Sequence, residues 1–376
     1  MATTLNHFIT TMLILGLLVT ISLDFTVAQI GVCYGRLGNN LLSPRQVVDL
    51  YKRHNIKRMR TYDADDAILE PLRGSGIELN VVITNGYLEC LAKEPNKAYE
   101  WVLNHIYKYP DVDLRYISVG NEVNPASSVS AVYAPYVLPA MRNIYREVCR
   151  FGYGNRIKVT TTVGMDTLGA SYPPENTEFL GAVKPYMRPI VAFMVKTGAP
   201  FMANVYPYFA YSSNDRIDEG YALLQEGHGI TINGVYYDNL FYAMVDAVYA
   251  AVERMVDPSL HATRGVYNRT IEKKGKHNQI GPEVVSESNE DSLLTVLVSE
   301  SGHPSHGGPK ASMENAKLYN QNLVDIVEGG TPRHPGPIET YIFALFNENQ
   351  KDGAETERHF GLFYPNGQPK YSINFN

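Results

Sequence analysis

The sequence predicts a single (β/α)8 barrel, an α/β fold in which eight parallel strands alternate with helices. Three observations predict it. Short apolar, β-branched runs recur along the chain, separated by longer amphipathic segments. Most of these runs are apolar throughout rather than alternating, which is typical of parallel strands covered by helices on their outer face. The length of 376 residues suits one such barrel with insertions.

The expected elements follow one another in a regular order. Strands are predicted at residues 29–34, 58–63, 79–84, 116–122, 158–163, 201–209, 294–300 and 340–348. Helices are predicted at residues 44–54, 64–72, 98–109, 131–151, 179–197, 237–255 and 314–327. Pro44 directly after Ser43 is the usual arrangement of first-turn proline and capping residue. Gly329 and Gly330 mark the end of the last helix.

An open, doubly wound sheet would explain the same alternation. Such a sheet usually carries a glycine-rich phosphate loop after its first strand, and residues 35–38 (Gly-Arg-Leu-Gly) do not match that pattern. Polar residues gather instead at strand ends, as in Asn121-Glu122 and Ser299-Glu300. In a closed barrel these positions meet at one face, so the pattern favours the barrel.

Two segments stand apart from the repeat. An apolar run at 13–21, followed by small residues up to Ala28, predicts a secretory signal peptide at 1–28. The run is shorter than the ~20 residues that span a membrane, so we expect residues 29–376 to form a secreted barrel without a membrane anchor. Residues 257–292 are long and polar, which predicts an atypical surface insertion carrying a glycosylation sequon at Asn268.

Composition excludes several functions. The net charge of -6 argues against nucleic acid or an anionic membrane as a partner. The three cysteines, Cys33, Cys90 and Cys149, do not have the spacing of a metal site, so neither a metal nor a cofactor is expected. The 27 tyrosines fit a surface that stacks on sugars, and equally a filler between barrel and helices.

Two glutamates end two of the predicted strands. Glu122 closes the run Tyr-Ile-Ser-Val-Gly-Asn-Glu, and Glu300 closes Leu-Thr-Val-Leu-Val-Ser-Glu. A carboxylate after a buried strand is costly, although a helix cap or an ion pair would explain one of them. Two at one barrel mouth favour glycoside hydrolysis, in which one carboxyl protonates the leaving oxygen and the other attacks or activates water. We expect carboxyl carbons ~5 Å apart, as in a retaining enzyme.

Several segments, spread in order over nearly the whole chain, make this sequence resemble glycoside hydrolase family 17, the plant β-1,3-glucanases. The matching segments are residues 29–35, 57–63, 119–122, 203–209, 298–302, 346–351 and 357–361. The resemblance implies a retaining endo-hydrolase of 1,3-β-D-glucosidic linkages in β-1,3-glucan, from fungal walls or callose. Glu122 would be its proton donor and Glu300 its nucleophile. The further substrate-binding or supporting residues that it implies are Tyr62, Asn121, Asn204, Tyr206, Phe209, Phe346, Glu348, Lys351 and Glu357.

With its acidic charge, the chain resembles the extracellular members of the family, so we expect it in the apoplast or cell wall. A role in plant defence and a monomeric state are also expected. Two departures from the family pattern leave alternatives open. His303 stands where the family usually has tryptophan, and a protonated His303 would lower the pKa of Glu300. The insertion at 257–292 precedes the nucleophile strand. A catalytically weakened barrel that binds β-glucan, or a mixed-linkage 1,3-1,4-β-glucanase, are the alternatives.

Overall fold

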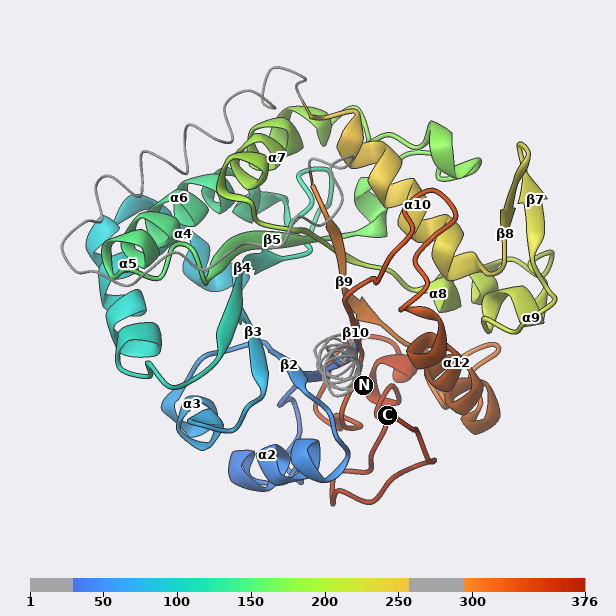
Figure 1. Cartoon of the computed structure of the whole chain (residues 1–376), viewed down its shortest axis with the longest axis horizontal. Coiled ribbons are helices and arrows are strands. Elements are labelled where there is room, and N and C mark those ends of the chain that lie inside the picture. The colour runs from blue at the N-terminus through green and yellow to red at the C-terminus, as the bar shows by residue number, and fades with distance from the viewer. Residues whose placement is uncertain (1–29, 257–293, 376) are drawn as a thin grey trace, which may run out of the picture.

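Eight parallel strands close into a barrel in the order β1-β10-β9-β6-β5-β4-β3-β2 (Figure 1). The structure is a computed structural model, and it describes residues 30–256 and 294–375. The closed order confirms the predicted (β/α)8 barrel. The expected signal peptide and the segment 257–292, with Asn268, lie outside the described residues.

All eight predicted strands are present, some of them shorter than expected. They are β1 Ile30–Tyr34, β2 Arg58–Thr61, β3 Glu78–Ile83, β4 Leu114–Asn121, β5 Lys158–Gly164, β6 Phe201–Asn204, β9 Val296–Ser301 and β10 Thr340–Ile342. The strand expected at 201–209 stops at Asn204, and Pro207 begins a helix there. Proline has no N–H for a strand ladder but fits a first helical turn.

Helices surround the barrel (Figure 1). They are α2 Pro44–Arg53, α3 Asp66–Leu72, α4 Leu88–Lys93, α5 Pro95–Val102, α6 Ala134–Arg150, α7 Lys184–Thr197, α8 Pro207–Ser213, α9 Glu219–Ala222, α10 Leu240–Glu253 and α12 Met313–Ile326. The start of α2 follows the expected signals, because Pro44 opens it and the Ser43 N–H donates to Gln46 Oε1 at 3.0 Å. Three of the short helices, α4, α8 and α9, were not predicted.

A small hairpin was also missed. Strands β7 Ile230–Ile232 and β8 Val235–Tyr237 pair antiparallel in the segment that joins β6 to α10. Asn233 and Gly234 turn the chain with positive φ values of 46° and 83°. An Asn-Gly pair between apolar residues is the usual signal of a two-residue hairpin, so the sequence carried the information. The helix expected from residue 237 therefore begins only at Leu240.

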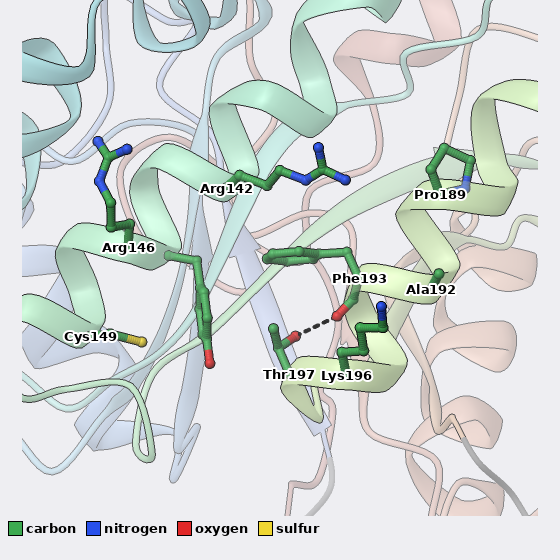
Figure 2. Close-up of a pocket in the computed structure, with 9 residues that line it drawn as sticks. Arg142, Arg146, Cys149, Pro189, Ala192, Phe193, Lys196 and Thr197 are labelled. Atoms are coloured by element: carbon green, nitrogen blue, oxygen red, sulfur yellow. Dashed lines mark hydrogen bonds between the residues drawn. The ribbon is translucent and has the colours of Figure 1, made fainter. Parts of the chain in front are cut away.

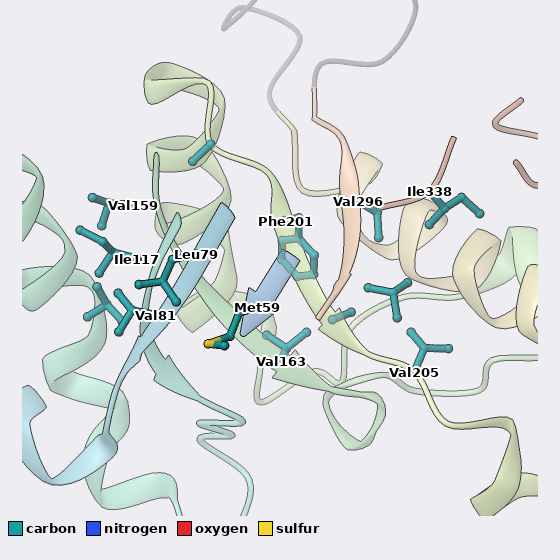
Figure 3. Packing of buried hydrophobic residues seen from close by; sticks show 14 of the residues in the cluster. Met59, Leu79, Val81, Ile117, Val159, Val163, Phe201, Val205, Val296 and Ile338 are labelled. Carbon is teal, nitrogen blue, oxygen red and sulfur yellow. The ribbon is translucent and has the colours of Figure 1, made fainter. Parts of the chain in front are cut away.

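The core has two layers because side chains alternate along each strand. Outward-facing residues pack between strands and helices, among them Met59, Leu79, Ile117, Phe201 and Val296 (Figure 3). Burying such a side chain contributes roughly 1.5–3 kcal/mol. The inner layer is a smaller cluster that fills the barrel and includes Cys33, Met202, Leu297, Tyr341 and Phe360. The outer layer therefore fixes the barrel, and inward positions remain available for polar residues.

Candidate active site

Glu122 follows the last residue of β4 in a backbone conformation that side chains rarely adopt. Its φ is 52°, and that of Gly120 is 82°. Such strain costs on the order of 1–3 kcal/mol and persists only where surrounding contacts hold it. The Glu122 N–H donates to the Thr162 carbonyl at 3.0 Å. Asn85 makes two hydrogen bonds to the backbone of Asn121, the residue before Glu122. It accepts from the Asn121 N–H at 2.9 Å and donates to the Asn121 carbonyl at 3.0 Å.

The Glu122 side chain has a neutral hydrogen-bond partner. Asn204, at the end of β6, donates from Nδ2 to Glu122 Oε1 at 2.8 Å. Glu122 as a whole residue is exposed at the mouth, yet the protein atoms that crowd its carboxyl group displace water from that group. This desolvation, followed by the charge of Glu300, raises the Glu122 pKa to about 7, although the Asn204 bond opposes the shift. Glu122 can therefore hold a proton near neutral pH.

Glu300 has different surroundings, on the inner face of β9, and is 6% exposed. Tyr62 donates its hydroxyl to Oε1 at 2.6 Å, and Tyr206 donates to Oε2 at 2.8 Å. The Nε of Arg60 lies 3.7 Å from Oε1. Hydrogen bonds and a nearby cation both favour the ionised carboxylate. The two carboxyl groups thus lie in unlike surroundings, because among the described residues Glu300 has an ion-pair partner and Glu122 has none.

Arg60 is a functional residue that the sequence reasoning missed. It lies on β2, is fully buried, and donates from Nη2 to Asn121 Oδ1 at 2.8 Å and to Thr162 Oγ1 at 3.3 Å. It therefore connects Glu300 with Asn121, the neighbour of Glu122. The position of Arg60 in the sequence could have revealed it, because an arginine inside a buried strand needs a partner within the barrel.

The predicted polar cluster lies on the segment after β10. Glu348 is 4% exposed and accepts from the Leu37 N–H at 2.7 Å, while burial raises its pKa. Lys351 pairs with Glu357 at 3.0 Å and lies 4.0 Å from the centre of the Phe343 ring. Phe343, which was not predicted, also meets the rings of Tyr62 and Tyr206 edge-on. This ring thus joins the polar cluster to the tyrosines that hold Glu300.

The two predicted phenylalanines lie in different places. Phe209 is 46% exposed and contacts Tyr206 with ring centres 5.4 Å apart, so its face is open to a ligand at the mouth. Phe346 is 2% exposed and packs edge-on against Tyr34 in the outer layer of the core. Phe346 can support the site only through the fold.

His303 is not a cation beside Glu300, and that expectation was wrong. The side chain is 1% exposed and lies against the rings of Tyr208 and Tyr319. Burial lowers its pKa to about 4, so it is neutral at higher pH. Its Nδ1 bonds the Pro304 carbonyl at 3.0 Å, and no described group bonds Nε2. The cation near Glu300 is Arg60 instead.

Other features lie apart from the two carboxyl groups. A hollow of about 540 Å³ lies on the barrel's outside between α6 and α7, lined by Arg142, Tyr145, Phe193 and Lys196 among others (Figure 2). All three cysteines are free thiols. Within residues 30–256 and 294–375, no group of three or more His, Cys, Asp or Glu side chains could hold a metal. No helix in the described part of the chain could cross a bilayer.

Two carboxyl groups in unlike surroundings at the mouth of a closed barrel are the arrangement that one class of enzyme uses, the glycoside hydrolases. The family follows from comparison with known sequences: the model of glycosyl hydrolases family 17 matches residues 30–263 and 284–375. The chain belongs to this family and is a glycoside hydrolase. Residues 264–283 lie between the two matched segments.

Full-length relatives agree with this assignment. A glucan endo-1,3-beta-glucosidase of Vitis vinifera is 42% identical over the whole of both chains. Glucan endo-1,3-beta-glucosidase B of Solanum lycopersicum is 42% identical over 96% of this chain and 91% of its own. Among solved structures, the Cryptomeria japonica pollen allergen CJP38, a beta-1,3-glucanase, is 39% identical with a TM-score of 0.81, covering 93% of this chain and 99% of its own.

Proposed function

We propose that this chain is a secreted, retaining endo-hydrolase of 1,3-β-D-glucosidic linkages in β-1,3-glucan. One observation carries the division of roles. Two tyrosine hydroxyls and the Arg60 guanidinium surround Glu300. The Glu122 side chain, in contrast, bonds only the Asn204 amide among the described residues and has a pKa of about 7. Two carboxyl groups with such different environments fit an ionised nucleophile, Glu300, and a protonated acid, Glu122.

The first chemical step forms a covalent intermediate. The Glu300 carboxylate attacks the anomeric carbon while the bond from that carbon to the leaving oxygen breaks. Glu122 transfers its proton to the leaving oxygen and becomes ionised. In the second step a water oxygen attacks the same carbon, Glu122 takes the proton, and the bond to Glu300 breaks. Both residues return to their starting states and the anomeric configuration is retained. The expected carboxyl separation of ~5 Å stays a prediction.

Surrounding residues supply the other functions that these steps need. Tyr62 and Tyr206 hold the Glu300 oxygens from two sides. Asn121 is fixed by Arg60 and by Asn85, so its amide can meet a sugar hydroxyl beside Glu122. The exposed ring of Phe209 offers a flat face for a sugar ring.

The linkage and the compartment rest on different support. Curated relatives with 42% identity are glucan endo-1,3-beta-glucosidases, which supports β-1,3-glucan as substrate. Secretion rests on the apolar run at 13–21 and the small residues up to Ala28. From these we propose the apoplast or cell wall as the site of action, fungal wall glucan or callose as the polymer and a role in plant defence.

One solved neighbour favours a second candidate. This neighbour is one of two plant beta-glucan endohydrolases with distinct substrate specificities. It is 40% identical to this chain and has a TM-score of 0.78. Because such enzymes differ in substrate specificity, the mixed-linkage 1,3-1,4-β-glucanase expected from the sequence is kept as the second candidate. In the described part of the chain the buried His303 bonds the Pro304 carbonyl and neither of the two carboxyl groups, so it gives no reason to prefer an inactive, glucan-binding barrel.

A reducing-sugar assay on laminarin, lichenan and xylan tests the proposal. We expect release of short oligosaccharides from laminarin, little from lichenan and none from xylan, with Glu300→Gln as the inactive control. Proton NMR during early hydrolysis should show the β-anomer first, as retention requires. Preferred cleavage of lichenan would support the mixed-linkage candidate. First release of the α-anomer would overturn the retaining mechanism.

A further inference from the structure

A chain of hydrogen bonds reaches Glu122 from the nucleophile strand. Ser299, on β9 and fully buried, donates from Oγ to Asn204 Oδ1 at 2.8 Å. Asn204, on the neighbouring strand β6 and 1% exposed, donates from Nδ2 to Glu122 Oε1 at 2.8 Å. Ser299 thus contacts Glu122 only through the amide between them, although it precedes Glu300 in the chain.

The orientation of this amide has a chemical consequence. An asparagine side chain donates from one side and accepts on the other. When Nδ2 faces Glu122 it stabilises the carboxylate, and when Oδ1 faces Glu122 it accepts a proton from the carboxylic acid. The two orientations have nearly the same shape, so packing alone does not select one. If the amide turned, the Ser299 hydroxyl would accept from Nδ2 and its own buried O–H would have no acceptor among the described residues. The hydroxyl therefore favours the first orientation, and by donating to Oδ1 it also polarises the amide toward stronger donation.

We propose that Ser299 is a positioning residue, which acts through Asn204 to keep the amide N–H of Asn204 directed at Glu122. This inference rests on the proposed function, because it concerns the residue that must lose and regain a proton in each turnover. A retaining enzyme needs Glu122 as an acid in the first step and as a base in the second. By favouring ionised Glu122, Ser299 supports the second step at some cost to the first.

Ser299→Ala tests the proposal, because the Asn204 amide is then free to turn. Protonated Glu122 can donate to Oδ1, so its pKa rises and the basic limb of the kcat/KM profile moves to higher pH. The net value of one hydrogen bond predicts a shift of about 0.4–1 pH unit. With an aryl glycoside that has a good leaving group, the second step limits turnover, so kcat near pH 6 should fall several-fold.

Ser301→Ala is the matched control. Ser301 lies on the same strand, is equally buried, and its hydroxyl bonds Tyr319 at 2.6 Å rather than Asn204. We expect a comparable loss of thermal stability from this variant, with the basic limb unmoved. Combining Ser299→Ala with Asn204→Ala should shift the limb no further than Asn204→Ala alone, because both changes remove the same influence on Glu122.

Two readouts separate this inference from the proposed function. Hydrolysis of laminarin by the unaltered chain tests the function, and ¹³C NMR titration of the Glu122 carboxyl tests the hydrogen-bond chain without any substrate. An upward shift of that titration in Ser299→Ala but not in Ser301→Ala supports the inference. Identical titration in both variants overturns it. If Ser299→Ala does not fold, Ser299→Cys gives the same test, because a thiol donates weakly and should produce a smaller upward shift.

Discussion

The two ends of the barrel hold glutamates with almost the same partners, Glu300 buried and Glu339 half-buried. At the mouth, Glu300 accepts from the hydroxyls of Tyr62 and Tyr206 and lies 3.7 Å from Arg60. At the opposite end, Glu339 accepts from Tyr116 at 2.9 Å and from Tyr341 at 2.8 Å, and it lies 3.9 Å from Arg58. Two tyrosines and an arginine around a glutamate are therefore not by themselves a sign of catalysis.

The second carboxyl group distinguishes the two ends. Near Glu339, Glu78 is paired with Arg58 at 2.8 Å and with Arg115 at 3.0 Å. Near Glu300, the second carboxyl is Glu122, which has no ion pair among the described residues and a pKa raised to about 7. At the end opposite the mouth, two arginines balance the two glutamates. The mouth keeps one carboxyl group without an ion pair, and this group can exchange a proton.

Unsatisfied groups show the same difference. Arg60 Nε and His303 Nε2 are buried at the mouth without a hydrogen-bond partner among the described residues. None of the side chains that bond Glu339 has such an atom in this part of the chain. Buried polar groups that lack partners are rare in native proteins, and functional sites are where natural sequences tolerate them. The surroundings of Glu300 and Glu339 thus differ in how completely their partners are paired, although buried atoms without partners also occur elsewhere, on Thr177 and Asn320.

Removal of the nucleophile should have the largest effect. Glu300→Ala should lower kcat on laminarin by at least about 10⁴-fold, because in the proposed mechanism no other group forms the covalent intermediate. Added azide should restore weak activity on an aryl β-laminaribioside and give the α-glycosyl azide. Glu339→Gln, the matched change at the other end, should keep kcat within a few-fold but lose about 1–3 kcal/mol of stability. Equal loss of activity in both variants would contradict the assigned difference between the ends.

Loss of the acid should have a smaller effect that depends on the substrate. Glu122→Ala should slow laminarin hydrolysis by about 10²–10⁴-fold, since the leaving oxygen needs a proton. An activated aryl laminaribioside, whose leaving group needs little protonation, should react much better, and azide should then give the β-glycosyl azide. The rates of both variants with and without azide measure this. The α-azide from Glu122→Ala, but not from Glu300→Ala, would reverse the two roles.

The pH dependence should show the raised pKa of Glu122. In the proposed mechanism Glu122 is protonated in the first step, so kcat/KM should fall as pH rises through about 7. Its folded pKa is above its ordinary value of 4.5, so its contribution to stability is present below 4.5 and disappears as pH rises toward 7. Glu122→Gln should therefore show a weaker loss of Tm over that range. If the basic limb of the kcat/KM profile instead coincides with the pH at which the protein unfolds, the assignment of this limb to Glu122 is wrong.

His303 should have the smallest effect, on stability in acid. Its folded pKa of about 4 is below its ordinary 6.5, so stability is lost as pH falls from 6.5 toward 4. His303→Phe removes the titrating group and the unpaired Nε2. We expect its Tm to exceed that of the unaltered chain by several degrees at pH 4.5 and by less at pH 7.5. Parallel Tm curves for the two proteins would show that His303 does not titrate in this range.

The sequence alone determined the fold and where polar residues enter the barrel. Apolar strand runs with a fixed rhythm allow few topologies, and parallel strands bring their carboxyl ends to one face. Asn121-Glu122 and Ser299-Glu300 could therefore be assigned to the mouth. The hairpin at Asn233-Gly234 was also predictable from its turn signal, and it was missed.

The tertiary structure alone decided the electrostatics. β5 and β6 lie between β4 and β9, so Asn204 of β6 reaches Glu122, and its amide links Ser299 of β9 to that carboxyl. Arg60, rather than His303, lies beside Glu300 for the same reason. Contacts between inward-facing side chains depend on the order and register of neighbouring strands, which residue type and spacing do not specify. Desolvation and charge act over these short distances, so the raised pKa of Glu122 follows from packing.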